Sequence, residues 1–190
     1  MWKPIGKVAA NFELMINETN WGGWNRGVNW QGKNRQDDKD LVGTAVGREG
    51  DKIIKQICRY NRFNWHWNIN RTYINNITKP HRDFGGEEPW DGKGNKKSSY
   101  NIVWEKTNNR EEALELAKLW RRFWIPMRDR EFGQFFESAY GPLCDWKAGD
   151  IFYLPATEYH AGATVSFNDR YTMLVEGLSI DLNEKLRKLV

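Results

Sequence analysis

The chain has 190 residues, of which 39% are hydrophobic and 28% are charged, proportions that are typical of one soluble globular domain. Its apolar runs are only a few residues long, whereas a membrane-spanning helix needs roughly 18–20, so we expect no part of it to cross a bilayer. The net charge of +4 is a mild basic excess without a long basic run, which favours anionic partners only weakly.

The N-terminal residues and the cysteines indicate where the protein is found. The start lacks the apolar stretch and the small-residue cleavage site of a secretory signal peptide, so we expect a cytoplasmic protein. The two cysteines, Cys58 and Cys144, are too few for a disulfide framework and lack the C-x-x-C spacing of a metal site. We therefore expect both to be reduced thiols.

No internal repeat, low-complexity tract or linker divides the chain, which predicts a single domain over residues 1–190. Residues 1–62 are expected to hold N-terminal helices and a loop rich in Gly, Asn and Trp. That loop, residues 17–50, shows no sustained period of 2 or 3.6 and carries Trp21, Trp24 and Trp30. We interpret it as a segment covering the open side of the fold, because substrate selection usually lies in loops over a rigid scaffold.

A helix and a strand follow this loop. From Asp51, apolar residues recur at helical spacing and predict a helix that ends near Asn61, with Cys58 facing the core. From Phe63 to Ile77, large apolar residues alternate with polar ones, the pattern of a half-buried strand. We place the start of a β-rich core, residues 63–178, at this strand.

The rest of the chain is predicted to be mostly short strands. A Gly-rich loop, residues 85–97, leads to a strand at residues 100–104, and an apolar face then predicts a helical insert over residues 109–125, stopped by Pro126. Further strands are predicted at residues 132–137, 151–154, 163–167 and 170–178, followed by a C-terminal helix in residues 179–190. The expected fold class is therefore mainly β with flanking helices.

Two histidines and a carboxylate stand in a pattern that suits a metal ion. His81 and Asp83 are two residues apart, so in an extended backbone they project to one face, roughly 6.6 Å apart along the strand. His160 follows a glycine turn and a short strand that begin at Gly149. Two imidazoles and one carboxylate form the 2-His-1-carboxylate set that suits Fe(II) with open coordination positions. A loop ion pair between His81 and Asp83 is the simpler alternative.

An arginine and a threonine complete the pattern. Arg170 comes ten residues after His160, and Thr172 shares its strand face by the same alternation. The planar guanidinium of arginine suits a carboxylate, and a threonine hydroxyl can add a hydrogen bond to it. A surface ion pair of Arg170 with Asp169 or Glu176 is the alternative.

These residues, in this order, resemble the Fe(II)- and 2-oxoglutarate-dependent oxygenase superfamily over about residues 64–178. The resemblance implies a double-stranded β-helix, a jelly-roll or cupin-like fold. It implies that His81, Asp83 and His160 ligate Fe(II), that Arg170 pairs with the distal carboxylate of 2-oxoglutarate, and that Thr172 supports it. Members of the superfamily often add a tyrosine to this pocket, and Tyr100 and Tyr73 are the candidates here, with Tyr100 preferred.

The resemblance further implies a reaction in which 2-oxoglutarate and O2 are consumed, succinate and CO2 are released, and a substrate C–H bond is hydroxylated. The substrate is expected to be a protein side chain or a small metabolite. The nucleic-acid demethylating branch is disfavoured, because its R-x-N-x-T-x-R motif is not met: Thr172, Leu174 and Glu176 stand where Asn, Thr and the second Arg are expected.

Two alternatives from other classes stay open. One is a non-catalytic jelly-roll binding module in which Trp21, Trp24 and Trp30 grip a sugar or peptide. The other is a metal-dependent cupin that works without 2-oxoglutarate, which would leave Arg170 without a role.

Overall fold

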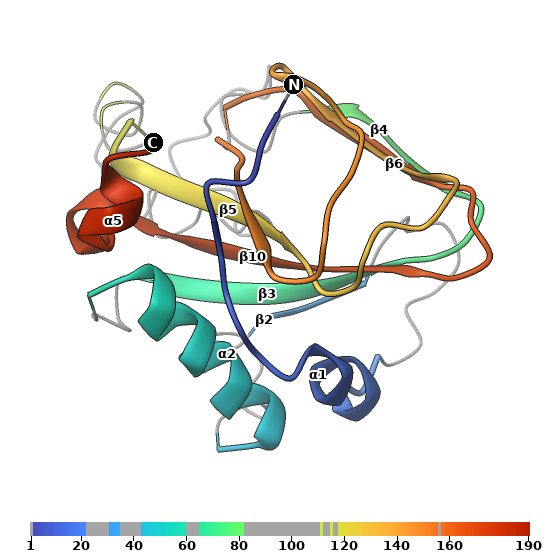
Figure 1. Ribbon diagram of the computed structural model, residues 1–190, viewed down its shortest axis with the longest axis horizontal. Coiled ribbons are helices and arrows are strands. Elements are labelled where there is room, and N and C mark those ends of the chain that lie inside the picture. Colours follow the sequence, from blue (N-terminus) through green and yellow to red (C-terminus); the bar gives the residue numbers. More distant parts are fainter. Residues whose placement is uncertain are drawn as a thin grey trace.

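The computed structural model describes residues 2–21, 31–34, 43–59, 65–81, 111, 115, 118–155 and 157–190, which form two antiparallel β-sheets with helices against one of them (Figure 1). The larger sheet has six strands in the order β1 (Gly6–Lys7), β8 (Asp150–Tyr153), β5 (Trp120–Pro126), β10 (Arg170–Leu178), β3 (Trp65–Thr72) and β2 (Gln31–Asn34). The smaller has four, in the order β4 (Asn76–His81), β9 (His160–Thr164), β6 (Gln134–Ser138) and β7 (Gly141–Leu143).

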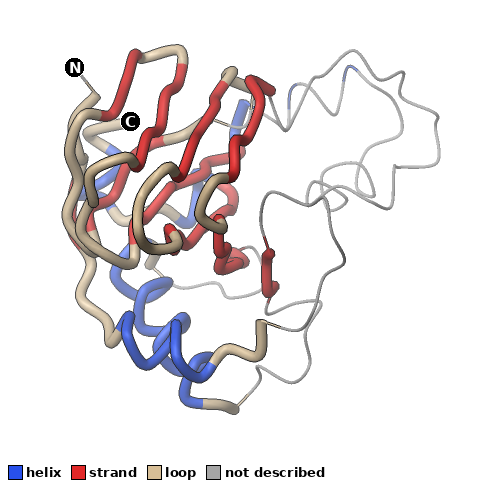
Figure 2. The backbone as a smooth tube through the Cα atoms, turned by 90° about the vertical axis from the view of Figure 1, so that its right-hand side faces the viewer, coloured by secondary structure: helices blue, strands red, loops and turns tan. Residues whose placement is uncertain are grey.

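The chain crosses repeatedly from one sheet to the other. It does so between β3 and β4, between β5 and β6, between β7 and β8, and between β9 and β10, so partners within a sheet are distant in sequence. Figure 2 shows the strands of the fold beside one another, with the largest helical stretches below them. This arrangement is a jelly-roll, or cupin, fold, and the predicted fold class is confirmed.

Two helices cover the face of the larger sheet that points away from the smaller one (Figure 1). They are α1 (Phe12–Glu18) and α2 (Ala45–Ile57), and their N-caps Asn11 and Thr44 accept hydrogen bonds from the backbone N–H groups of Leu14 and Gly47. The main core lies between these helices and the sheet, and its central buried side chains are Met15, Ile53, Ile57, Trp65, Trp67, Ile69, Phe123, Ile125, Met173 and Val175.

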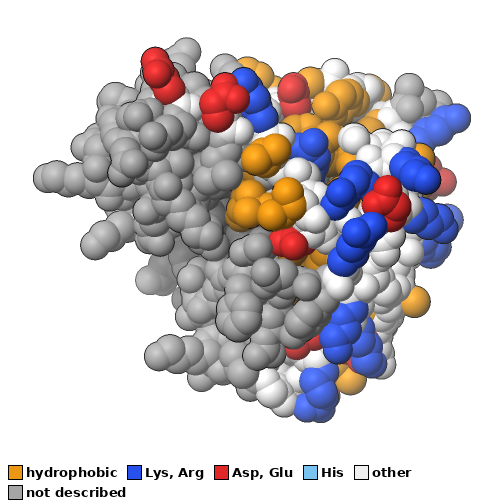
Figure 3. All heavy atoms as spheres, turned by 90° about the vertical axis from the view of Figure 1, so that its left-hand side faces the viewer, with side chains coloured by type: hydrophobic (Ala, Val, Ile, Leu, Met, Phe, Trp, Pro, Cys, Tyr) orange, Lys and Arg blue, Asp and Glu red, His pale blue; other side chains and the backbone are white. Residues whose placement is uncertain are grey.

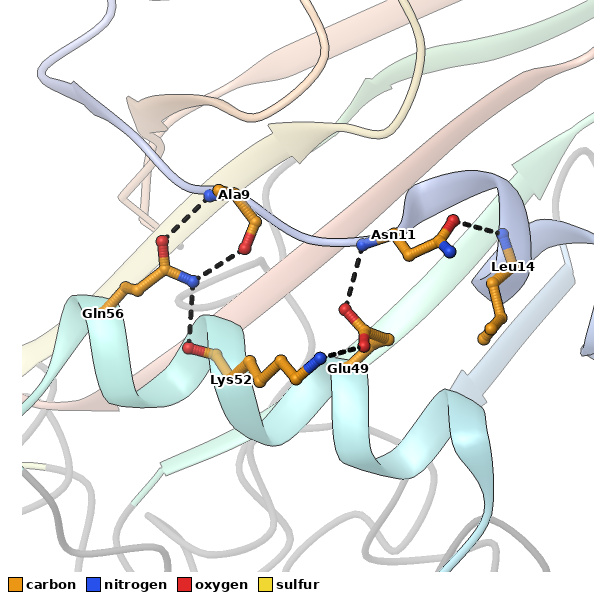
Figure 4. Close-up of polar contacts among 6 residues, drawn as sticks. All are labelled: Ala9, Asn11, Leu14, Glu49, Lys52 and Gln56. Atoms are coloured by element: carbon orange, nitrogen blue, oxygen red, sulfur yellow. Dashed lines mark hydrogen bonds and ion pairs between the residues drawn. The ribbon is translucent and has the colours of Figure 1, made fainter.

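Polar contacts hold the chain before α1 onto α2 (Figure 4). The Gln56 side chain accepts a hydrogen bond from the backbone N–H of Ala9 and donates one to its carbonyl, each at 2.9 Å. The Glu49 carboxylate accepts from the backbone N–H of Asn11 at 2.9 Å and pairs with Lys52. The Asn11 contact, followed by the Lys52 contact, lowers the pKa of Glu49.

The predicted loop over residues 17–50 is wrong where the structure describes it. Helix α1 extends to Glu18, β2 occupies Gln31–Asn34, and α2 begins at Ala45 rather than near Asp51. Trp21 is partly buried against the core, and its ring lies 5.6 Å from that of Tyr171. Trp24 and Trp30 lie outside the described residues.

The predicted helical insert at residues 109–125 is wrong over its second half. Residues 111, 115, 118 and 119 are helical, but β5 begins at Trp120. Nearly all of β5 is buried, because it lies between β8 and β10 in the centre of the larger sheet. Aromatic and branched side chains suit such a strand, and burial on both faces removes the alternation that would have distinguished it from a helix.

The long strand predicted from Phe63 to Ile77 is two strands. It turns after Thr72, where Asn75 adopts a left-handed backbone with φ of 61°, a conformation that asparagine tolerates well. The strand predicted at 170–178 is confirmed, and those predicted near 132–137, 151–154 and 163–167 appear as β6, β8 and β9 with shifted bounds. The strand predicted at 100–104 lies outside the described residues.

The C-terminal segment is only partly helical. A 3-10 turn, η2 (Ser179–Asp181), precedes a short helix, α5 (Glu184–Arg187), and Leu182 and Leu186 are buried against the core. Cys58 is buried and Cys144 is exposed, and neither forms a disulfide. Among the described residues, no helix is long and apolar enough to cross a membrane.

On the face that Figure 3 shows, lysine and arginine side chains lie among acidic and hydrophobic ones instead of forming one uninterrupted block. The ion pair between Arg59 and Glu184, at 2.7 Å, is one contact between opposite charges of this kind. The mild positive charge of the chain is therefore dispersed over this face.

Candidate functional site

A cavity of about 140 Å³ lies between the two sheets, and much of its wall is polar. Strands β3, β5 and β10 of the larger sheet supply one side, and β4, β6 and β9 supply the other. Its polar lining residues are Asn68, Asn70, Thr72, Thr78, His81, Arg122, His160, Arg170, Thr172 and Glu176. Its apolar lining residues, Trp124, Phe136, Leu154 and Leu174, belong to or pack against a second hydrophobic cluster, so the cavity combines a polar wall with an apolar one.

The alternation of strand side chains explains the polar wall. On β3, Trp65, Trp67 and Ile69 belong to the core beneath the helices, whereas Asn68 and Asn70 line the cavity. On β10 the even-numbered residues from Arg170 to Glu176 line the cavity, and the intervening odd-numbered ones face the other way. The polar face of the predicted strand is thus turned to an interior chamber, not to bulk water.

The two predicted metal-ligating histidines are brought together. His81 ends β4 and His160 begins β9, the two residues are paired across the sheet, and their ring centroids lie 4.3 Å apart. His160 is 8% exposed, and its ring stacks on Phe136 at 6.0 Å. Two imidazoles this close on one cavity wall can share one metal ion.

Backbone carbonyls set which nitrogen of each histidine faces a ligand. Nδ1 of His81 lies 2.8 Å from the carbonyl oxygen of Lys79, and Nδ1 of His160 lies 3.1 Å from that of Glu158. Because a carbonyl oxygen only accepts, we assign the proton to Nδ1 in both rings, so Nε2 is the nitrogen of each ring that can ligate a metal. This outer hydrogen bond is the usual support of a metal-ligating histidine.

The predicted third ligand, Asp83, lies outside the described residues. Within the described ranges, no three His, Cys, Asp or Glu side chains cluster as a metal site would require. Of the three predicted ligands, the structure therefore describes His81 and His160. The expected carboxylate, Asp83, follows His81 by two residues in the sequence.

Arg170 is the most unusual residue of the cavity. Only 5% of it is exposed, and Nη1 donates a hydrogen bond to the carbonyl oxygen of Phe135 at 2.7 Å. Nε is buried and has no hydrogen-bond partner, and no described carboxylate forms an ion pair with the guanidinium. Burial lowers the pKa of Arg170 to about 10, so the group is still a cation at neutral pH.

Neighbouring residues leave room for this guanidinium. A Cβ atom on Gly162 would lie 2.8 Å from Nη2 of Arg170, closer than a real contact allows, so the absence of a side chain there admits the arginine. The ring of Phe136 lies 5.7 Å from the guanidinium carbon. Asp169, the expected alternative partner, pairs instead with Arg71 at 2.6 Å.

Asn70 adds a second polar group without a partner. Its Nδ2 donates to Oδ1 of Asn68 at 3.0 Å, but its own Oδ1 is buried and accepts no hydrogen bond. Asn70 is paired across the sheet with Thr172, which is two residues along β10 from Arg170 and lies on the same face of the strand. A buried polar atom without a partner is costly, so both Nε of Arg170 and the Asn70 amide are positioned for a ligand that supplies the missing bonds.

At the other end of the cavity, Arg122 and Glu176 form a buried pair of opposite charges. The two residues are paired across β5 and β10, Nη1 lies 4.0 Å from Oε1, and 2% and 1% of the side chains are exposed. Nε of Arg122 donates to the carbonyl oxygen of Leu154 at 3.2 Å. Glu176 is therefore an interior residue opposite an arginine of β5.

The two tyrosines proposed for the cosubstrate pocket gain no support. Tyr73 does not line the cavity; its ring lies 4.7 Å from the guanidinium carbon of Arg71. Tyr100 is outside the described residues. Asn70 and Thr72, which sequence reasoning missed, occupy the cavity wall instead, and the alternation that starts at Trp65 was the signal that could have found them.

Comparison with protein-family models found no match, and no curated protein matches the sequence. Solved structures do match. KdgF from a Halomonas species has a TM-score of 0.40 and 9% identity, covering 85% of this chain and 90% of its own. A Cupin 2 conserved barrel domain protein from Salinispora arenicola has a TM-score of 0.40 and 10% identity, covering 90% of both chains.

Some matched structures are named as enzymes. A sugar phosphate isomerase of a cupin superfamily from Silicibacter pomeroyi has a TM-score of 0.32 and 9% identity, covering 60% of this chain and 50% of its own. A structure of DMSP lyases has a TM-score of 0.35 and 11% identity, and this chain covers 38% of its length. None of the structures named here is a 2-oxoglutarate oxygenase, and likenesses this distant carry no argument about activity.

Proposed function

We propose that the protein is an Fe(II)- and 2-oxoglutarate-dependent dioxygenase that hydroxylates a C–H bond of a protein side chain or a small metabolite. The observation that carries the proposal is Arg170, a nine-tenths buried cation without a carboxylate partner among the described residues, in the same cavity as His81 and His160. An anionic ligand that reaches the cavity offsets the cost of burying this charge.

The two histidines of the cavity and Asp83 would supply the donor types that suit Fe(II). Nε2 of His81 and Nε2 of His160 would hold Fe(II), with the carboxylate of Asp83 as the third ligand, and this set leaves coordination positions for a 2-oxo acid and O2. When bound, the iron and 2-oxoglutarate supply the oxidising chemistry, in which succinate and CO2 are released.

The residues of the chain bind and orient the cosubstrate. Nε of Arg170 donates to its distal carboxylate, which gives a charge-assisted hydrogen bond, and the Thr172 hydroxyl supports the same group. Rotating the Asn68 and Asn70 amides by 180° keeps the bond between them and turns Nδ2 of Asn70 toward the ligand as a donor. Apolar lining residues, including Trp124 and Phe136, limit the access of water.

Anaerobic titration of the Fe(II)-loaded protein with 2-oxoglutarate tests the proposal. A weak visible charge-transfer band is expected in the wild type, and it is expected to be lost in His160→Ala and in Arg170→Met. Arg128→Met is a matched control, because Arg128 pairs with Glu13 at the surface and does not line the cavity. A wild-type protein that binds iron but gives no band and no change in iron affinity with 2-oxoglutarate overturns the proposal.

A metal-dependent cupin that does not use 2-oxoglutarate is the second candidate. The observation that favours it is the hydrogen bond from Arg170 to the Phe135 carbonyl, which gives the arginine a structural use without any cosubstrate. In that case Arg170→Met keeps both metal binding and activity. The non-catalytic module is less favoured, since Trp21 packs inward.

A further inference from the structure

The outer face of the smaller sheet exposes several large apolar side chains. In β4, β9 and β6 alternate residues point into the fold, and the intervening ones point outward to solvent. Across these strands, Ile77 is paired with Ala163, and Ala163 is paired with Phe135, so the three form one outward row. Ile77 is 60% exposed and Phe135 is 42% exposed.

Three turns extend this row at one end of the sheet. Nδ2 of Asn168 donates to the Glu131 carboxylate at 3.1 Å, which holds the turn of Phe167 beside that of Phe132, and the backbone N–H of Ile74 donates to Asp169 at 2.9 Å. Backbone hydrogen bonds from Val165 to Gly133 and from Asn75 to Thr164 also tie these turns to the end of the sheet, and we refer to their exposed apolar side chains together with the row as the apolar sheet face. Its members and their exposed fractions are Phe132 91%, Phe167 94%, Val165 61%, Ile77 60%, Ile74 45% and Phe135 42%.

The size of this surface is that of an interface. At roughly 200 Å² for each ring, the three phenylalanines alone expose about 450 Å². The largest apolar patch on a typical monomer is about 300–600 Å², and a standard interface buries about 800 Å² per partner. With its three aliphatic members added, the apolar sheet face is of the order that a stable dimer requires.

The charges at the other end of the face are self-complementary. Lys79 lies in the irregular part of β4 between Thr78 and His81, Glu137 on β6 is paired with Ala161 of β9, and both side chains are exposed. Neither side chain forms an ion pair with another described residue. A two-fold axis that runs along β9 places β4 of one copy over β6 of the other, and therefore sets Lys79 opposite Glu137 twice.

We propose that the apolar sheet face is the interface of a homodimer, with the two-fold axis along β9. The same rotation lays Ile77 over Phe135 of the second copy and brings the Phe132 and Phe167 turns of both copies to one end. The two small sheets then pack face to face, as sheets in sandwiches do. This inference is independent of the proposed chemistry.

A membrane surface fits the same face less well. The exposed phenylalanines lie on turns that carry Glu131 and Asp169, and the Arg71 guanidinium is already paired with Asp169. Acidic groups around apolar tips are repelled by anionic lipid, whereas membrane-binding tips are usually surrounded by lysine and arginine.

Sedimentation velocity of the full chain over a range of concentrations tests the proposal. The expected wild-type mass is twice the 22.4 kDa of one chain. Phe135→Glu is expected to weaken the dimer at least about 30-fold, the effect of losing an interface hot spot. Ile180→Glu, at a residue that is 64% exposed but outside the apolar sheet face, serves as the matched control and should leave the mass unchanged.

A charge swap tests the predicted symmetry. Lys79→Glu and Glu137→Lys are each expected to weaken the dimer through like charges, and the double variant is expected to restore it, because the swapped charges meet again across the two-fold axis. A monomeric wild type at 100 µM, or a double variant no better than the singles, overturns the proposal. Cosedimentation of monomeric protein with phosphatidylcholine and phosphatidylserine vesicles would overturn it in favour of a membrane surface.

Discussion

Replacing Arg170 with methionine separates the cost of burying its charge from its use in binding a ligand. Burial lowers the pKa of Arg170 to about 10, and at 1.36 kcal/mol per pKa unit this shift corresponds to roughly 3 kcal/mol of instability at neutral pH. The substitution removes this cost, but it also breaks the hydrogen bond to the Phe135 carbonyl, which is worth about 1.5–3 kcal/mol. The two effects nearly cancel.

We therefore expect the free energy of unfolding of metal-free Arg170→Met to lie within about 2 kcal/mol of the wild type, measured by urea denaturation. Ile125→Ala, at a fully buried position, is a contrasting variant and should lose about 2–5 kcal/mol. Affinity for 2-oxoglutarate, measured by the anaerobic titration, should fall at least about 30-fold in Arg170→Met, because the carboxylate loses a buried charged partner.

Two results would refute this reasoning. A loss of more than about 4 kcal/mol in Arg170→Met would mean that the arginine is a structural element whose charge is already compensated in the folded protein. Unchanged binding of 2-oxoglutarate, in a variant that is folded and binds iron, would mean that another group holds the carboxylate.

Three further predictions concern residues around the cavity and the helices. Gly162→Ala places a methyl group 2.8 Å from Nη2 of Arg170, so we expect weaker 2-oxoglutarate binding with unchanged iron affinity; equal loss of both would argue against a local displacement. Asn70→Asp puts a carboxylate beside the bound anion and should weaken 2-oxoglutarate binding more than Asn70→Ala does, as the same titration would show. The pKa of Glu49 is lowered in the folded protein, so its contribution to stability is full above the unfolded value of 4.5 and is lost as the pH falls through the lower folded value. Urea unfolding of Glu49→Gln should accordingly depend less on acid pH than that of the wild type, and parallel profiles would contradict the assignment.

The sequence predicted the parts of the fold in which local pattern and tertiary setting agree. Alternation of apolar and polar residues located β3, and the spacing of His160, Arg170 and Thr172 anticipated that all three line one cavity. These predictions succeeded because strand alternation determines which face a side chain joins, whatever the partner strands are.

The failures have a different physical origin. The segment Trp120–Pro126 has apolar residues at spacings that also suit a helix, and only its position between β8 and β10 makes it a strand. The cavity-lining role of Asn70 depends on the second sheet, which turns the polar face of β3 inward. Pairing between distant segments is not encoded in a local window, so neither result could be read from the pattern alone.

The two faces of β3 and β10 have different surroundings, and this difference affects which amino-acid substitutions each strand can accept. Residues of the main core point toward the helices, and residues that line the cavity point the other way, although both kinds alternate along one strand. Substitutions at the polar positions Asn68 and Thr172 can therefore alter the cavity wall without removing a side chain of the core beneath the helices, whereas Arg122 and Glu176 form a buried pair that a single substitution would break. An insertion of one residue in either strand would exchange the two sets and abolish stability and binding together.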